Sequence, residues 1–251
     1  MKKVTLLCGL LLALSVSVAS AAGVNLRWLA CYGDAGVQNR ASTCLTNTGT
    51  NPLVGSFQLP ADVLGVTGIE AIVDLASAGS ALPAWWTFNA PGGAVGCKGG
   101  ALTVNATIAV TAVNCADWAG GAAAGGLAAY QIGNYGPNTA RIKIGFAVAT
   151  PVDVLGAQEY FAFNCNVSNV KTVGTGSCAG CLTPVCISMS SINVVPGTRP
   201  GIKLFGATNG TDSNFATWQG GAGVGTTLGN GCPAATPTRN TTWGSVKSLY
   251  R

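Results

Sequence analysis

The chain has 251 residues, only 8% of which are charged, and its 13 basic and eight acidic side chains give a formal net charge of +5. Apart from Lys2 and Lys3, the basic residues are scattered singly along the sequence, which argues against nucleic acid as a partner. Histidine is absent. This excludes serine–histidine and cysteine–histidine catalytic pairs and histidine-based metal sites.

Residues 1–21 have the pattern of a secretory signal peptide. Lys2 and Lys3 precede the apolar stretch Leu6–Val18, and Ala19–Ala21 is a small-residue cleavage site. The apolar stretch is too short for an ordinary membrane span, so no transmembrane segment is expected in the mature chain. The cysteines that follow residue 21 are typical of an oxidising compartment. We therefore expect a secreted or cell-surface protein, with the periplasm as an alternative.

The first half of the mature chain shows short apolar runs separated by turn residues. Strands are predicted at 24–31, 54–59, 69–75, 82–88 and 102–113, with a possible helical turn between 60 and 68. Ile69–Leu75 alternates apolar and polar residues, which places one set on each face of a strand. Glycines argue against a long helix in 116–129, where a short helix or turn is expected before a strand that opens at 128–133.

The strongest strand patterns lie in the second half. Period-two alternation predicts strands at 140–149 and 159–169, with a turn at Thr150–Pro151 between them, and a further strand follows at 186–195. Weaker strand patterns occur at 203–208 and 215–219. The fold expected is an all-β, antiparallel β-sandwich of residues 22–208 with disulfide-stapled loops. Residues 209–251 are expected to form a glycine-rich C-terminal extension, with a short terminal segment packing on the domain.

Nine cysteines follow the leader, and structural disulfides are the favoured interpretation of them. The pairing hypothesis joins Cys31 to Cys44 and Cys97 to Cys115. It places two more bonds among Cys178, Cys181, Cys186 and Cys232. Cys165, on the apolar face of its strand, is left over. A zinc site of the Cys178 cluster with Cys232 as fourth ligand stays open as an alternative, whereas a thioredoxin-like setting for a redox CxxC is missing.

Carboxylates alone could hydrolyse a glycoside, so their spacing matters. Glu70 and Asp74 share a strand face, but four strand residues separate them by about 13 Å. A glycosidase needs two carboxylates roughly 5–9.5 Å apart. Asp117, Asp153 and Glu159 are isolated in sequence and could converge only through the fold. A carboxylate-dependent glycan hydrolase is therefore kept as an alternative function.

Tryptophan faces suit the apolar faces of sugars. Trp85 and Trp86 would point to opposite sides of an extended strand, so at least one of them should meet solvent or a loop. Together with Trp118 they are the candidate ligand-binding residues. No metal ligand set and no cofactor motif is expected.

The order of strands in residues 69–195 resembles that of cohesin-type and carbohydrate-binding β-sandwich modules of secreted bacterial proteins. The resemblance lies in the strand-like segments IEAIVDL, ARIKIGFAVA, VLGAQEYFAFNCNV and CISMSSINVV. It implies a nine-stranded jelly-roll used for binding or scaffolding without catalysis. The nine cysteines and the glycine-rich tail depart from that pattern.

These observations predict an exported, non-enzymatic β-sandwich that acts as an extracellular binding or structural surface component. The expected partner is a glycan or another extracellular protein. A glycan-binding module and a carboxylate-dependent hydrolase are the alternatives.

Overall fold

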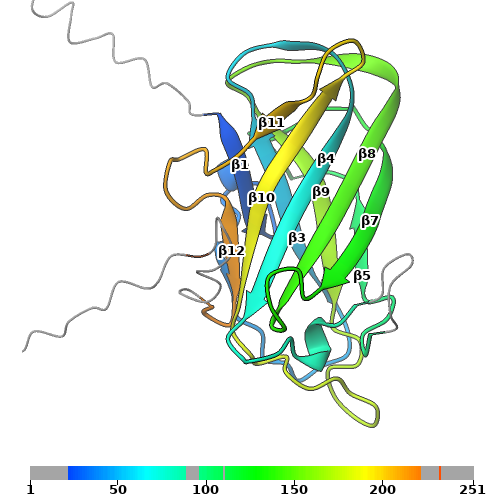
Figure 1. Cartoon of the computed structure of the whole chain (residues 1–251), viewed down its shortest axis with the longest axis vertical. Helices are drawn as coiled ribbons and strands as arrows, with labels where there is room; N and C mark the ends of the chain where they lie inside the picture. Colours follow the sequence, from blue (N-terminus) through cyan, green and yellow to red (C-terminus); the bar gives the residue numbers. More distant parts are fainter. Residues whose placement is uncertain (1–21, 89–95, 110, 222–231, 233–251) are drawn as a thin grey trace, which may run out of the picture.

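The computed structural model describes residues 22–88, 96–109, 111–221 and 232, and these form two β-sheets packed face to face (Figure 1). The prediction of an all-β sandwich is confirmed, and most strand pairs are antiparallel. The signal peptide predicted for residues 1–21 and the terminal segment predicted after residue 232 lie outside the described residues. In the described part of the chain, no helix combines the length and the apolar character needed to cross a membrane.

The smaller sheet has five strands. Its order is β1 (Gly23–Trp28), β3 (Thr50–Gln58), β9 (Glu159–Ser168) and β5 (Leu102–Asn105), with β6 (Ala116–Asp117) also paired to β9. The larger sheet has seven strands. Its order is β2 (Asn39–Arg40), β12 (Phe215–Trp218), β10 (Val185–Pro196), β4 (Val63–Ser77), β8 (Thr139–Val154) and β7 (Ala124–Ile132), with β11 (Ile202–Leu204) also paired to β10. The long strands β10, β4 and β8 lie side by side in Figure 1.

The core forms between the sheets from the alternating apolar sets. In β4, Ile69, Ala71, Val73 and Leu75 are all buried, whereas Glu70 lies on the outer face. The register places Val73 beside Ile142 of β8 and Ala71 beside Ile144. Each large side chain buried in this way contributes roughly 1.5–3 kcal/mol. Alternation in the sequence thus predicted the inward faces of the central strands correctly.

The segment predicted as a strand at 82–88 is instead a short 3₁₀ helix, η2 (Ala84–Trp86), and this prediction was wrong. In a 3₁₀ turn, successive side chains are about 120° apart, so neighbours need not point to opposite sides. Trp85 and Trp86 therefore both turn into the core. They pack there with Trp218, whose ring centroid lies 5.0 Å from that of Trp85 and 5.7 Å from that of Trp86.

Other boundaries also differ from the predictions. β8 does not turn at Thr150–Pro151 but continues to Val154, along an irregular part of its pairing with β4 that accommodates the proline. β5 ends at Asn105, because the Asn105 side-chain oxygen accepts the Thr107 N–H and turns the chain. Between 60 and 68 no helical turn forms, since β4 begins at Val63.

The Gly/Ala-rich segment 116–129 forms the expected turn at residues 118–121, but it also contains β6 and most of β7. The sheet also continues past residue 208, the boundary set from the sequence. β12 pairs with β10 inside the larger sheet, and β2 extends it in parallel. Residues 215–218 are thus an inner strand of the sandwich and not part of an extension.

Four disulfides join the eight cysteines expected to be bonded, but with different partners. The bonds are Cys31–Cys115, Cys44–Cys181, Cys97–Cys178 and Cys186–Cys232. The predicted pairs Cys31–Cys44 and Cys97–Cys115 were wrong. Cys31 and Cys115 belong to a separate apolar cluster, whereas Cys44 and Cys97 pack against the main core. Within the second predicted group, only the Cys186–Cys232 bond forms. Cys165 is unpaired and buried, as predicted.

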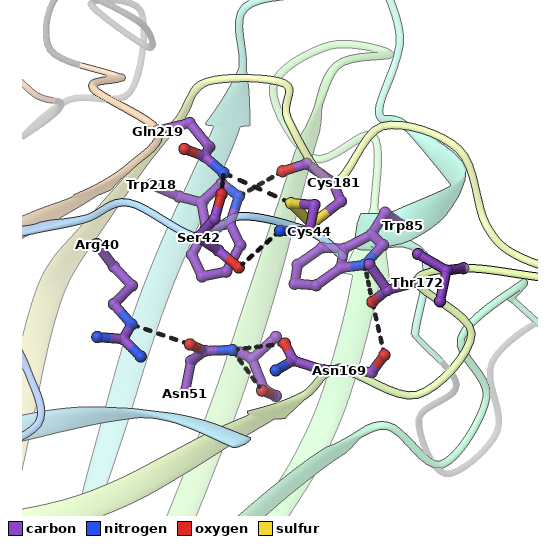
Figure 2. Close-up of a disulfide and its surroundings, with 12 residues drawn as sticks. Arg40, Ser42, Cys44, Asn51, Trp85, Asn169, Thr172, Cys181, Trp218 and Gln219 are labelled. Carbon is purple, nitrogen blue, oxygen red and sulfur yellow. Dashed lines mark hydrogen bonds between the residues drawn. A yellow bond between two sulfur atoms is a disulfide. The ribbon is translucent and has the colours of Figure 1, made fainter. Parts of the chain in front are cut away.

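The four disulfides indicate an oxidising, extracellular type of environment. The bond between Cys44 and Cys181 lies beside the tryptophan cluster, as Figure 2 shows. There the Trp218 indole N–H donates to the Cys181 carbonyl at 2.6 Å, and the Trp85 indole N–H donates to Thr172 at 2.9 Å. The Cys44–Cys181 disulfide and the hydrogen bonds of the two indoles thus stabilise the same end of the core.

Candidate functional site

The outer face of the seven-stranded sheet carries a row of polar side chains across neighbouring strands. The row starts at Lys203 of β11, which pairs with Asn193 of β10. It continues to Glu70 of β4 and then to Gly145 of β8. Since directly opposed residues in paired strands lie close together, the polar groups of this row share one surface.

The next row along the same face contains Ser191, Ile72 and Lys143. Between the rows the surface is hollowed into a groove of about 490 Å³, lined by residues of both. Gly145 explains the hollow. A Cβ built on Gly145 would meet no atom within 4 Å, so this position leaves open space where a side chain would stand.

The groove offers several kinds of hydrogen-bonding and stacking groups. The Asn193 amide donates to a Glu70 carboxylate oxygen at 3.2 Å. In the part of the chain that the structure describes, Lys143 and Lys203 lie within ion-pair distance of no carboxylate. The Lys203 ammonium group lies 5.2 Å from the ring centroid of Phe205, whose side chain is exposed. A polar ligand would find donors and acceptors in the groove, and the Phe205 ring lies beside the groove residue Lys203 without lining the groove.

Glu70 differs from the other seven carboxylates, all of which are described and are used by the fold. Five accept backbone N–H groups (Asp34, Asp62, Asp117, Asp153 and Glu159), and two pair with arginine (Asp74 and Asp212). Glu70 is exposed and accepts only the bond from Asn193 among the described residues. Glu70 is therefore a groove carboxylate that accepts no backbone N–H group among the described residues.

The carboxylates considered for glycoside hydrolysis do not form a catalytic pair. Asp74 is buried and is held by two hydrogen bonds from Arg141, at 2.7 and 2.9 Å, and one from Ser190. The parallel pairing of β6 with β9 does bring Asp117 and Glu159 into adjoining strands.

Asp117 and Glu159 nevertheless have structural partners. The two oxygens of Asp117 accept the N–H groups of Ala119 and Gly121 and close a turn. Glu159 accepts the Gly33 N–H at 2.8 Å and the Tyr32 N–H at 3.1 Å, which ties the 3₁₀ turn η1 (Tyr32–Asp34) to the sheet. Carboxylates occupied in this way are poorly placed to donate a proton to, or attack, a substrate.

The three tryptophans chosen as ligand-binding candidates are all buried. Trp85 and Trp86 are at most 1% exposed, and Trp118 is 4% exposed. Neither of the first two meets solvent, because the 3₁₀ turn directs both inward. Trp85 does meet a loop, since its indole N–H donates to Thr172 in the segment between β9 and β10. Substituting them would test folding and not binding.

Lys98 is the unusual member of this aromatic cluster. Its side chain is fully buried, its ammonium group lies 3.5 Å from the ring centroid of Trp85, and it donates to the Ser168 carbonyl. Desolvation by burial lowers the pKa of Lys98 to about 7. Lys98 thus places a titratable group inside the core, where no ligand can reach it.

Cys31, Asp34 and Cys115 are the one grouping of potential metal ligands found in the described part of the chain. The two sulfur atoms are bonded to each other. Both oxygens of Asp34 accept backbone N–H groups, from Val113 and Asn114 to one and from Cys115 to the other. In the oxidised protein this grouping fastens η1 to the segment before β6.

Replacing Asp34 by alanine is expected to lower the free energy of unfolding by about 1–2 kcal/mol, since three backbone N–H groups lose their acceptor. Burial acts to raise the pKa of Asp34, but the hydrogen bonds from Asn114, Val113 and Cys115 outweigh it and lower this pKa. The unfolded chain therefore binds the proton first as pH falls, and the stabilisation present above about pH 4 is lost below it.

Urea unfolding of Asp34→Ala and wild type at pH 7 and pH 3 checks this expectation. The difference between the two proteins should shrink at pH 3. Asp34→Asn is the matched control, because it keeps the oxygen that accepts two of the three bonds and should lose less. An equal difference at both pH values would contradict the role given to the charge.

Sequence reasoning missed the groove, although the signal was present. Alternation in 140–149 places Lys143 and Gly145 on the polar face of their strand, and alternation in 69–75 does the same for Glu70. Finding the groove requires that these faces be adjacent and in register, which the sequence does not show. Asn193 and Lys203 come from further strands of the same sheet.

Comparison with protein-family models, with curated proteins and with solved structures finds no match to this chain.

Proposed function

We propose that this protein is an exported, non-enzymatic β-sandwich that binds an extracellular glycan through the groove on the outer face of its seven-stranded sheet. The observation that carries the proposal is the open groove at Gly145 with the Glu70–Asn193 pair on its surface. A carboxylate beside an amide can accept and donate hydrogen bonds to neighbouring hydroxyl groups, as sugar rings require.

The surroundings of the pair support a polar polymer over an apolar ligand. Phe205 offers an exposed ring for stacking, and Lys143 and Lys203 add hydrogen-bond donors on either side of Glu70. One carboxylate between two ammonium groups suits a neutral or weakly acidic sugar. The likeness to cohesin-type and carbohydrate-binding sandwiches, including a jelly-roll arrangement, remains part of this proposal.

Binding is favoured over hydrolysis because Glu70 stands without a second available carboxylate. Glycoside hydrolysis requires two carboxyl groups on opposite sides of the scissile bond. Seven of the eight acids are held by backbone or arginine, which leaves one acid for the groove. A single carboxylate can orient a sugar but cannot serve as both acid and base.

Retention on insoluble polysaccharides and on a glycan array tests the proposal. Gly145→Leu is expected to weaken binding at least about tenfold, because the new side chain would fill the groove. Glu70→Gln should weaken it by a smaller factor. Ala149→Leu is the matched control, since this exposed residue of the same strand does not line the groove and its substitution should leave binding unchanged.

Wild-type protein that is retained by no glycan would overturn the proposal in favour of a purely structural surface component. Equal binding by wild type and Gly145→Leu would place any glycan site elsewhere. Product release from a bound polysaccharide, abolished in Glu70→Gln, would support a hydrolase and contradict the non-enzymatic assignment.

A further inference from the structure

The two lysines of the groove on the seven-stranded sheet lie on opposite sides of Glu70. Lys203 belongs to β11 and Lys143 to β8, with β10 and β4 between these two strands. Neighbouring strands are about 4.8 Å apart, so about 14 Å of sheet separates the two lysine-bearing strands. Both lysines are exposed, and neither forms an ion pair among the described residues. Each end of the groove therefore offers a positive charge to a ligand.

The carboxylate of Glu70 lies between these two charges. Glu70 belongs to β4, two strands from Lys203 and one strand from Lys143. The Asn193 amide donates to one Glu70 oxygen at 3.2 Å and so orients the carboxylate. Gly201 makes room for Asn193, since a Cβ on Gly201 would lie 2.2 Å from the Asn193 Oδ1. Across the strands the groove thus presents a positive, a negative and a positive group in that order.

The neighbouring charges on this face leave that order unchanged. Along β4 and β8 the next charged side chains are Asp74 and Arg141, and two hydrogen bonds of 2.7 and 2.9 Å join them into a neutral pair. Two ammonium groups and one carboxylate then give the groove itself a charge of +1. An anionic ligand is therefore attracted at the two ends and repelled at the centre.

We propose that the groove selects a glycan in which acidic sugars alternate with neutral ones, an inference that rests on the glycan-binding function proposed above. The chain would run across the strands, with the carboxylates of two acidic sugars beside Lys143 and Lys203. The neutral sugar between them would meet Glu70 and Asn193 with its hydroxyl groups. An acidic group on every sugar would place one of them over Glu70, and a wholly neutral chain would leave both lysines without a counter-charge.

Calorimetry with fragments of equal length tests the selection. The probes are hyaluronan, whose uronic acids alternate with neutral sugars, polygalacturonate, which is acidic at every sugar, and chitin, which is neutral. Hyaluronan should bind about fivefold more tightly than either of the others, because an exposed ion pair contributes up to this factor. Raising the salt concentration from about 0.02 to about 0.5 M should remove its advantage over chitin.

Substitutions in the groove should change the selection in opposite directions. Lys143→Gln and Lys203→Gln should each weaken hyaluronan binding about threefold and leave chitin binding unchanged, since glutamine keeps a donor and loses the charge. Glu70→Gln should bring polygalacturonate to the affinity of hyaluronan. Lys171→Gln is the matched control, because Lys171 is exposed and does not line the groove. Its substitution should leave all three affinities unchanged.

Two results would overturn the selection and leave glycan binding in place. One is chitin or polygalacturonate binding as tightly as hyaluronan, with Gly145→Leu weakening both ligands. The other is hyaluronan binding that neither lysine substitution weakens. If none of the three fragments binds while the glycan array retains neutral glycans, the selection is likewise wrong and the proposed function stands. An array that retains no glycan at all would overturn both.

Discussion

Replacing Cys44 and Cys181 together by alanine is expected to lower the free energy of unfolding by about 4 kcal/mol. This bond spans 137 residues of sequence and connects the loop before β3 to the loop before β10. Without it, the unfolded chain gains conformational freedom that folding must remove again. The melting temperature should fall by roughly 8–16 °C.

The size of the expected loss in unfolding free energy depends on the other disulfides as well as on Cys44–Cys181. A lone disulfide closing a loop of this length would contribute roughly 5 kcal/mol in the chain-entropy model. Cys97–Cys178 ends only three residues from Cys181, so the unfolded chain already holds these loops together in part. That shorter effective loop reduces the expected loss.

Contacts that the linked loops make in the folded protein also affect the loss of stability. The Trp218 indole donates to the Cys181 carbonyl, and Gln219 donates to the Ser42 carbonyl, so the linked loops also hold the end of β12 (Figure 2). Cys44 has a φ of +55°, a conformation that costs free energy in the folded protein, so its relaxation without the bond offsets part of the loss. Loosening this corner should expose the tryptophan cluster.

Guanidinium unfolding followed by tryptophan fluorescence measures the loss. Cys165→Ala is the control, because it removes a buried thiol and keeps all four disulfides; it should cost about 1 kcal/mol. A double variant as stable as wild type would show that the remaining bonds and packing fix this end of the sandwich unaided.

Replacing Lys98 by methionine is expected to stabilise the protein by about 1–4 kcal/mol at pH 6, with the gain shrinking as pH rises. A buried ammonium group is unfavourable unless it is paired, and all eight carboxylates are engaged elsewhere or lie in the groove. Only the Trp85 ring and the Ser168 carbonyl offset its desolvation. Methionine fills a similar volume without the charge.

The pH dependence follows from the lowered pKa of Lys98, about 7 in the folded protein against roughly 10.4 in the unfolded chain. Below pH 7 Lys98 is protonated in both the folded and the unfolded state, and the folded state bears the full desolvation cost of the buried charge. Above pH 7 the unfolded chain binds the proton that the folded state has lost, so wild-type stability rises by up to about 1.4 kcal/mol per pH unit. The methionine variant should lack this rise.

Urea unfolding at pH 6.0, 7.0, 7.7 and 8.5 tests the expectation, and the difference between variant and wild type is the quantity of interest. The range ends at about pH 8.5 because burial raises the pKa of Cys165 to about 12, so ionisation of the unfolded thiol offsets the rise in wild-type stability at higher pH. Lys171→Met is the control, since Lys171 is exposed. A constant difference across the range would falsify the proposed titration of Lys98.

Local pattern was enough to predict the strands and their inward faces wherever alternation was long. Residues 69–75 and 140–149 show long alternation, and the structure buries the predicted sets because a strand side chain has only two directions available. The sequence also determined that the cysteines would be bonded and that Cys165 would not. These are local or compositional properties, which need no knowledge of neighbours.

Which distant groups meet depends on the three-dimensional packing of the chain. Trp85 and Trp86 turn inward together because a 3₁₀ turn replaces the predicted strand. Each cysteine pairs with the cysteine that the fold brings next to it, even when the two are far apart along the chain. The groove at Gly145 likewise requires β11, β10, β4 and β8 in one register. Pairing between strands far apart in sequence depends on packing of the whole sandwich, and local patterns carry no record of it.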